Sequence, residues 1–460
     1  MTDASKAKLS TLGEATYGVT PAAALREWRY TSCSLAPNAS YIASQEIRAD
    51  RQPSDQIRTG FTASGSVGFE LSYDAEFATR MVGVMMCDGS GASTVTTYTA
   101  ATISFVAATN IVNSSVAGFL QTAGSWIEIT GSVSNNGIFK VVSATTSDLV
   151  LSGKQVVTEA AGASVTIKHH LERDTGSQLR SFTIEVEPTG TAGLFQTYTG
   201  CVFSSMSLDI PAQGVITGAF EVAAQTPVAG SVTAGTGAIV AADVNSVMNT
   251  ETNFLALYMG GPENGTRNIV SATDATPVVV TTAAAHSIHT GDLVMIAGCT
   301  QAGLNTTWIA TRVSSTTFSL DGSTTATMAA AATDGNIRLL KVAVPMVSGS
   351  FTISNATRDR TQAGVLGPVS KGLGQLSVTG TIRMYYSSQR NFGRFISDEY
   401  TGLAFIVRDA SLNHYIFEIP RVKFTAAPAI VGGNDTDMIV EVAFAATREG
   451  TDNRTFRFCK

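Results

Sequence analysis

Residues 61–86 read FTASGSVGFELSYDAEFATRMVGVMM, and this stretch joins a strand pattern directly to a helix pattern. Apolar residues first alternate with small or polar ones, which predicts a strand with one buried face. Asp74 then suits a helix N-cap, and the apolar residues after it recur at helical spacing. The apolar face of the strand is Val67, Phe69 and Leu71, and that of the helix is Phe77, Met81 and Val84.

A fainter copy of this pattern lies in the second half of the chain. Residues 63–71 read ASGSVGFEL and residues 378–386 read VTGTIRMYY. Ser387 is the expected cap of the second helix, whose predicted apolar stripe is Phe392, Phe395 and Ile396. Further strands are expected at 182–186, 198–208 and 216–222, and again at 404–407, 415–424 and 438–444. Each half therefore predicts a hairpin, one helix, a second hairpin and a closing strand.

A smaller repeat interrupts both halves. Residues 124–131 read GSWIEITG and residues 291–298 read GDLVMIAG, and after each comes a second apolar alternation ending in glycine. Alternating apolar residues between glycines predict strands with one buried face. We expect two small inserted β modules, at residues 99–168 and 268–340, with Trp126 and Trp308 filling their cores.

A long polar connection precedes the main strand in each half. These connections are residues 48–60 and 357–374, and a tight hairpin needs only two to five residues. Long loops usually have a task of their own, so we expect contacts with another subunit, against the alternative of solvated mobile loops. The charged candidates for such contacts are Arg48, Asp50, Arg51, Asp55, Arg58, Arg358, Asp359, Arg360 and Lys371.

The composition favours a β-rich structural protein. Of the 460 residues 44% are hydrophobic and 14% charged, which excludes a disordered polyampholyte. A net charge of −6 argues against a protein that clamps nucleic acid tightly. Five scattered cysteines predict no disulfide framework. We expect neither a signal peptide nor a membrane span, because the N-terminus lacks an apolar segment and no apolar run is long enough.

Residues that could perform catalysis or bind metal are sparse. Of the five histidines, His286 and His289 lie near Asp292 and Cys299, but this spacing carries little information about metal. Both this pair and the pair His169 and His170 are expected at surface or turn positions, and His414 is expected to pack beside a strand. Phosphate loops and nucleophile elbows are absent from the sequence. We expect no catalytic, cofactor-binding or metal site, and hence no enzyme.

Residues 34–86 resemble the major tail tube proteins of long, non-contractile-tailed bacteriophages. The resemblance rests on the strand end EIRADRQ, the long loop after it and the run GSVGFELSYDAEF that leads into the helix. The opening residues 12–19, LGEATYGV, are also similar. The match covers mainly residues 10–86 and 181–222, and the second half follows as the internal copy.

The resemblance implies an all-β fold with minor α content: two tandem tail-tube β-sandwich domains, each with one flanking helix. Domain 1 would comprise residues 1–98 and 169–225, interrupted by the module at 99–168. Domain 2 would comprise a linker and sandwich at 226–267 and 341–460, interrupted by the module at 268–340.

The resemblance also implies a function, because such domains form rings that stack into the tube carrying double-stranded DNA into the host. With two folds on one chain, three chains would supply the usual six, as a trimer with pseudo-sixfold symmetry. The implied partners are tape measure, tail terminator and tail tip proteins, and the place is the virion tail, assembled in the host cytoplasm. The strand alternation puts Glu70 and Arg383 on polar faces, where we expect them to line the lumen. The alternatives are a decoration or adhesin-like virion protein, and a carbohydrate-active β-sandwich enzyme.

Overall fold

The computed structural model describes most of the chain, and every statement below concerns the described residues. These are 6–87, 95–152, 156–188, 194–225, 227–260, 267–286, 288–325, 332–339, 342–386, 390–430, 437–450 and 454–460. Strands dominate, with two α-helices, α1 (Ala75–Val84) and α2 (Arg390–Ile396), in that part of the chain. The prediction of an all-β protein with minor α content is confirmed. Neither of these helices is long and apolar enough to cross a membrane.

The main body is a single hydrogen-bonded sheet that folds over itself into two layers, which we call inner and outer. The inner layer holds β3 (Ser32–Cys33), β4 (Ala36–Ala43), β5 (Gln56–Glu70), β16 (Thr217–Ala224), β26 (Ser348–Ser354), β29 (Ser377–Tyr385), β32 (Ala429–Ile430) and β33 (Ile439–Ala446). The outer layer holds β1 (Lys8–Glu14), β2 (Arg26–Glu27), β13 (Glu172–Asp174), β14 (Ser181–Glu187), β17 (Pro227–Gly230), β18 (Phe254–Gly260), β25 (Val342–Val344), β30 (Tyr400–Arg408) and β34 (Arg457–Cys459).

Two long strands belong to both layers. They are β15 (Phe195–Ile210) and β31 (His414–Ala426). The first part of β15 pairs with β14 and its second part with β16. Likewise, β31 pairs first with β30 and then with β33. One hydrophobic core, shared by both halves of the chain, collects buried side chains from both layers.

The first helix forms as the sequence predicts. The Asp74 carboxylate accepts a hydrogen bond from the backbone N–H of Glu76 at 2.9 Å, which caps the helix. Phe77, Met81 and Val84 are all buried in the shared core. The aromatic ring of Phe77 reaches across to the second half, where its centroid lies 5.1 Å from that of Tyr415.

The second helix differs from its prediction. Ser387, the expected cap, lies outside the described residues. Phe395 packs against the core, but Phe392 is 47% exposed and Ile396 is 66% exposed. The predicted apolar stripe is therefore only partly covered within the single chain.

The smaller repeats form two separate sheets. The first module holds β6 (Thr97–Ala100), β7 (Ile103–Val106), a 3-10 turn at Ala107–Thr109, β8 (Ile111–Ser114), β9 (Trp126–Thr130), β10 (Gly137–Ala144), β11 (Asp148–Ser152) and β12 (Val165–His169). The second is a closed barrel of β19 (Arg267–Ala272), β20 (Val279–Thr282), β21 (Asp292–Ala297), β22 (Thr307–Arg312), β23 (Thr317–Leu320) and β24 (Asn336–Leu339), with a 3-10 turn at Ala302–Leu304.

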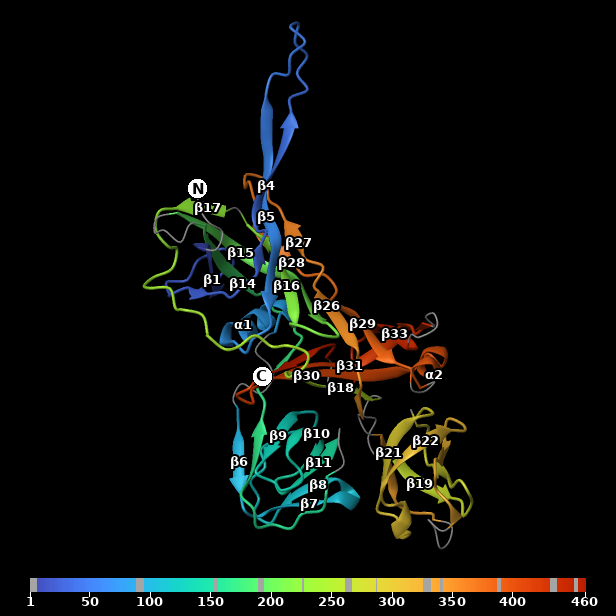
Figure 1. Cartoon of the computed structure of the whole chain (residues 1–460). Coiled ribbons are helices and arrows are strands. Elements are labelled where there is room, and N and C mark those ends of the chain that lie inside the picture. The colour runs from blue at the N-terminus through green and yellow to red at the C-terminus, as the bar shows by residue number, and fades with distance from the viewer. Residues whose placement is uncertain are drawn as a thin grey trace.

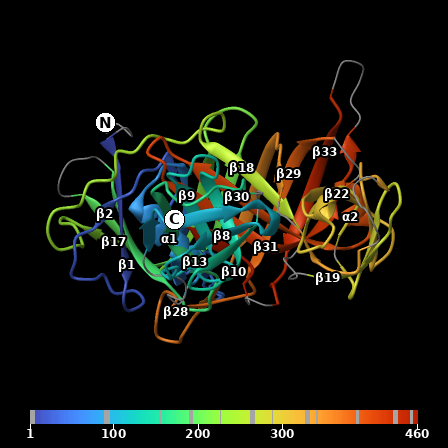
Figure 2. The ribbon, with the colours of Figure 1, turned by 90° about the horizontal axis from the view of Figure 1, so that it is seen from below.

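Each module has its own hydrophobic core. Ile127 and Ile129 of the first module are fully buried, as are their predicted counterparts Val294 and Ile296 in the second. Both modules lie on one side of the main body, opposite the projecting β4–β5 hairpin (Figure 1). Seen from that side, the barrel lies at the end of the molecule far from the N-terminus (Figure 2).

Candidate functional site: the polar sheet face and its edges

The inner layer has one buried and one polar face. In β5 the side chains of Val67 and Phe69 are buried, whereas Glu70 is exposed, which is the predicted alternation. In β29, Ile382 is buried and Arg383 exposed in the same way. Each strand therefore directs its buried side chains into the shared core and its polar side chains out of the sheet.

The polar face is continuous across both halves of the chain. Glu70 lies opposite Thr217, which lies opposite Asp209 on the next strand. Asp209 in turn lies opposite Ser350 of the second half, and Ser350 opposite Thr381. Because directly opposed residues of an antiparallel sheet share a face, these five side chains point the same way. Arg383 follows Thr381 by two positions, so the structure brings Glu70 and Arg383 onto one face.

Small and hydroxyl-bearing residues cover most of this face, and acids outnumber bases on it. Arg383 forms an ion pair with Glu441 of the neighbouring strand at 3.6 Å, with both side chains nearly half exposed. An exposed pair of this kind contributes little stability. The charged side chains that the register places on this face are Glu70, Asp209, Glu221, Glu441, Arg383 and Lys423.

The two halves meet at a seam between β15 and β26. Six residue pairs lie opposite each other there, from Ser205 with Ser354 to Ile210 with Gly349. Beside the seam, the Asn355 side chain donates hydrogen bonds to the carbonyls of Val84 and Phe203, at 2.6 and 3.1 Å. One sheet edge of the first half is therefore closed by the second half of the same chain.

The two long connections adopt different structures. In the first, β5 begins at Gln56, so residues 56–60 are strand and not loop. Arg48 and Asp50 form an exposed ion pair in this projecting hairpin, and Arg58 lies over the ring of Phe61. Arg51 and Asp55 are also exposed. The hairpin extends away from the body (Figure 1).

The second connection folds back as a short hairpin of β27 (Arg358–Arg360) and β28 (Ser370–Gly372). The Lys371 ammonium forms an ion pair with Asp359, while the flanking Arg358 and Arg360 are exposed. This connection reaches the first half, because the Leu366 carbonyl accepts a hydrogen bond from Phe61 N–H at 3.1 Å. The Pro368 carbonyl likewise accepts one from the Gln225 side chain at 2.8 Å. It thus bridges the two halves within one chain.

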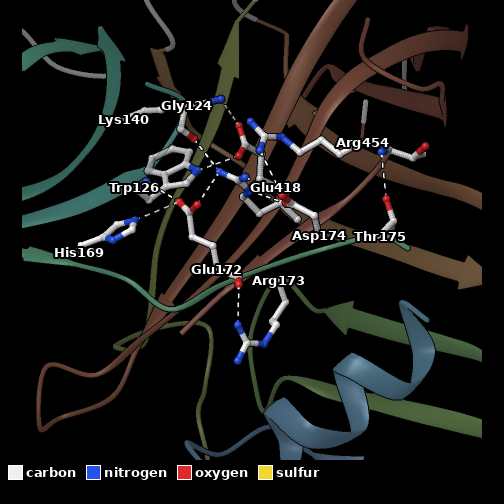
Figure 3. Close-up of polar contacts among 12 residues, drawn as sticks. Gly124, Trp126, Lys140, His169, Glu172, Arg173, Asp174, Thr175, Glu418 and Arg454 are labelled. Carbon is white, nitrogen blue, oxygen red and sulfur yellow. Dashed lines mark hydrogen bonds and ion pairs between the residues drawn. The ribbon is translucent and has the colours of Figure 1, made fainter. Parts of the chain in front are cut away.

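A buried polar network anchors the first module to the second half (Figure 3). The Trp126 indole donates to Glu418 of β31 at 2.9 Å, and the Lys140 ammonium pairs with the same carboxylate. Arg457 of β34 binds both oxygens of Asp174 at 2.6 and 2.7 Å, and pairs with Glu172 at 2.8 Å. Burying these groups is costly unless every charge is paired, which makes the junction depend on the whole network.

Apolar contacts complete this junction. Trp126 packs with Ile138, and with Ala404, Ile406 and Ile416 of the second half. The expectation that Trp126 fills the core of its own module is therefore wrong. Trp308, in contrast, packs against the core of the second module. Residues 403 and 405, next to those that face the module, point instead into the shared core. The first module therefore covers the side of the outer layer that faces away from the polar face.

The second module is anchored by a different buried ion pair. Arg394 of α2 pairs with Asp292 of β21, and both side chains are fully buried. His289 lies 2.6 Å from Glu399, which also pairs with Arg312. The spacing of His289 and Asp292 thus reflects attachment of the module to the second half.

Three histidines, His169, His170 and His414, lie at the first junction. All three are buried, as are His286 and His289 in the second module, so the expectation of surface or turn positions for both histidine pairs is wrong. Burial lowers the pKa of His170 to about 3 and that of His414 to about 4. Both imidazoles are therefore neutral at physiological pH.

Sequence reasoning did not single out Glu172, Glu418, Arg394 or Arg457, although one signal was available. In HYIFEIP, at residues 414–420, a lone acid interrupts an apolar strand. A charge in such a position requires a buried partner. The identity of that partner depends on the tertiary fold and could not be read from the sequence.

A two-layer β body with a continuous polar face is typical of a structural protein. A comparison with family models agrees, because the model described as phage tail tube protein matches residues 4–446. The chain belongs to that family, and it is a component of the virion tail assembled in the host. A search of curated proteins found no match.

Proposed function

We propose that this chain forms the tube wall by joining its inner layers edge to edge into closed rings, which stack into the conduit for double-stranded DNA. The β15–β26 seam is the observation that carries the proposal. At this seam, one half of the chain extends the sheet of the other by regular antiparallel pairing, which supports the same kind of joining between chains. Two folds per chain then give a ring of three chains with pseudo-sixfold symmetry, in which every sheet edge is paired.

The polar face would line the bore of this tube. Hydroxyl-bearing side chains and an excess of acids offer phosphate few cationic partners, so DNA would pass without being held. Glu70 and Arg383 would both face the DNA in this arrangement. The surplus of acid would repel the phosphate backbone, and Arg383 would have its charge partly balanced by Glu441.

The modules would then lie on the exterior. The first module covers the side of the outer layer that faces away from the polar face, which corresponds to the outside of a ring. The separate sheets and cores of the modules support their division from the main body. Within the body, which has one sheet and one core, the repeated strand pattern supports sandwich 1 at residues 1–98 and 169–225 and sandwich 2 at 226–267 and 341–460. The modules at 99–168 and 268–340 would be decorations carried by those sandwiches.

The two long connections would hold neighbours together. Residues 357–374 already bridge the halves within one chain. The first hairpin, with Arg48, Asp50, Arg51, Asp55 and Arg58, would do the same toward a neighbouring subunit or the next ring. Its exposed apolar residues support this role, since Ile47 is 99% exposed and Ile42 58% exposed in the single chain. The tape measure, tail terminator and tail tip proteins would bind at the ends and interior of the completed tube.

Electron microscopy of the purified full-length protein tests this proposal. We expect rings of six densities around an open centre, in which the two halves of each of three chains alternate. At higher concentration we expect tubes. Particles that remain single globules would contradict it and favour a decoration or adhesin-like protein that displays its modules.

A further inference from the structure

The two halves match residue by residue, which allows one sheet interface to be derived from another. Val67 of β5 pairs with Phe220, and its counterpart Ile382 of β29 pairs with Val442. The strands on the other side of β5 and β29, which are β4 and β26, correspond in the same way. Pro37 lies opposite Ala63 just as Ile353 lies opposite Val378, the counterpart of Ala63.

Irregularities in the sheet repeat as well. The register of β15 against β16 shifts between Phe203 and Ser205, and that of β31 against β33 shifts between Phe424 and Ala426. A bulge inserts one residue at a defined position, so matching bulges fix the alignment of the two strands. Beyond the bulge, β32 continues the alignment, with Ala429 opposite Val440. Residues 426–428 are therefore the counterparts of 205–207.

This alignment identifies two free edges. In the first half, residues 205–207 pair with β16 on one side and with residues 352–354 of β26 on the other. Their counterparts at 426–428 have no strand on that side, in the described part of the chain. The counterpart of β26 is β3 with β4. These two strands pair with β5 on one side, and their other side is unpaired among the described residues. Pro37 lies in this segment, and proline within a sheet is typical of edge strands.

We propose that β4 of a second copy of this chain pairs with residues 426–428 in the register of the internal seam. Asn38 would lie opposite Ala426, Pro37 opposite Ala427, and Ala36 opposite Pro428. These positions repeat the pairs that Ser205, Met206 and Ser207 make with residues 354, 353 and 352. The inference rests on the proposed ring and specifies how its chains join.

The exposed face of α2 supports the same partner. Phe392 is the counterpart of Phe77, because the strands before the two helices align and the helices follow at the same distance. Phe77 is buried and contacts Tyr415 and Phe417 of the second half, whereas Phe392 is 47% exposed. By the same alignment Tyr415 corresponds to Leu194, which is 59% exposed. A second copy seated in the proposed register would bring its Leu194 toward Phe392 and cover both.

Paired cysteines test the register in the full chain, with Cys33→Ser as background because Cys33 lies beside the edge. The proposed register predicts disulfides between Ala36→Cys and Pro428→Cys, and between Asn38→Cys and Ala426→Cys. The matched controls exchange partners: Ala36→Cys with Ala426→Cys, and Asn38→Cys with Pro428→Cys. These pairs use the same four positions but lie about two residues, or ~7 Å, out of register.

After mild oxidation, the proposed pairs should convert most chains into covalent trimers on a non-reducing gel, and the exchanged pairs several-fold fewer. If rings form but the exchanged pairs cross-link better, the register is wrong and the proposed function stands. If no rings form by electron microscopy, the proposed function itself fails.

An independent observation concerns the first junction. Glu128 of β9, His170 and His414 bring their ligand atoms within 4.8 Å of one another, and all three residues are buried. Neither ring nitrogen of His170 or His414 has a hydrogen-bond partner. Buried polar atoms without partners are costly and call for an explanation.

We infer that these three residues form a zinc site which fastens the first module to the second half. Two imidazoles and a carboxylate are a ligand set that zinc accepts, with a fourth position left for water. Tetrahedral bonds of about 2.1 Å place ligand atoms about 3.4 Å apart, close to the 3.8 Å between His414 Nδ1 and Glu128 Oε1. The nearby positive charges of Lys168 and Arg408 oppose a cation, while Glu128 and Asp409 supply the balancing negative charge.

Elemental analysis of the full chain purified from zinc-supplemented cells tests this site. We expect about one zinc per chain in the wild type, and visible absorption of a tetrahedral centre when Co²⁺ replaces the zinc. Glu128→Gln and His414→Gln should each lose the metal, whereas His286→Gln, a buried histidine of the second module, should keep it. A wild type without stoichiometric zinc and without a Co²⁺ band overturns the inference, as does metal retained by both variants.

Discussion

Met206 and Ile353 lie directly opposite each other in neighbouring strands, although one belongs to the first half of the chain and the other to the second. Both side chains are fully buried. The seam between the two halves of the chain is therefore ordinary sheet, with a hydrophobic core on one side and a polar face on the other. An interface between separate subunits could use the same construction.

Asn355→Ala should weaken this seam. The substitution leaves the carbonyls of Val84 and Phe203 without their side-chain donor, at a cost of about 1–3 kcal/mol. Urea unfolding of the full chain would show it as a lower midpoint. Thr352→Ala is the matched control, because Thr352 is exposed on the polar face and its loss should be nearly neutral. Equal midpoints for the two variants would show that Asn355 does not hold the seam.

Glu70→Lys should change DNA passage and leave folding intact. Glu70 is exposed, so reversing its charge removes no buried contact, yet it adds a cation to the proposed bore. We expect unchanged thermal unfolding and ring formation, with slower DNA release from virions that carry the variant. Arg383→Glu should act in the opposite direction. If Glu70→Lys prevents folding, the assignment of this face to the lumen is wrong.

Shortening the projecting hairpin should separate ring formation from tube growth. Ala43 lies opposite Gln56, so an Asn-Gly turn can replace residues 44–55 without disturbing the strands below. The variant should fold and form rings, because the inner layer is retained, but its rings should not stack. Sedimentation and electron microscopy distinguish the two states, and tubes of normal length would contradict a role for this hairpin in stacking.

Asp292→Asn should loosen the second module. Breaking one partner of a fully buried ion pair leaves Arg394 buried without its counter-charge, which typically costs about 3–5 kcal/mol. Limited proteolysis should then cut around the module faster than in the wild type. The double variant Asp292→Leu with Arg394→Met should recover part of the loss, since it removes both charges. Unchanged proteolysis of the single variant would mean that the ion pair does not anchor the module.

Glu418→Gln should have the corresponding effect on the first module. Glu418 accepts from Trp126 and pairs with Lys140, and an amide neutralises the charge that balances this ammonium. Hydrogen exchange should rise at β9 and β10 while the second module stays protected. Glu46→Gln, on the exposed hairpin, is the control and should change neither module.

Local patterns in the sequence predicted local structure well. The alternation through Val67 and Phe69 and the cap at Asp74 depend on neighbours in the chain, and both were confirmed. The stripe of α2 was predicted from the same kind of pattern, yet Phe392 is exposed. An amphipathic pattern shows that a face needs covering, but not whether the cover comes from the same chain or from another.

Long-range pairing was beyond the reach of the sequence. Nothing local to Trp126 indicates that its indole meets Glu418, which follows 292 residues later. The register of the seam could not be predicted either, because the apolar alternation of β15 would fit β26 in several alignments. The two lumen candidates are not counterparts of each other, since Arg383 occupies the position that Gly68 has in the first copy. Pattern reasoning therefore located the polar faces without showing that they join.

The first module follows α1, whereas the second precedes β26 and β29, so the two modules are inserted at different points of the repeat. This difference has a geometric consequence for a tube built from this chain. Suppose that a ring is rotated so that each sandwich takes the place of its neighbour. The inner wall would look almost unchanged, because the strands that line the bore repeat. Seen from outside, the same turn would exchange every barrel for its unlike neighbour. The rotation between successive rings would thus hardly change the surface that the DNA meets. On the exterior, the same rotation would produce a helical pattern of two alternating protrusions.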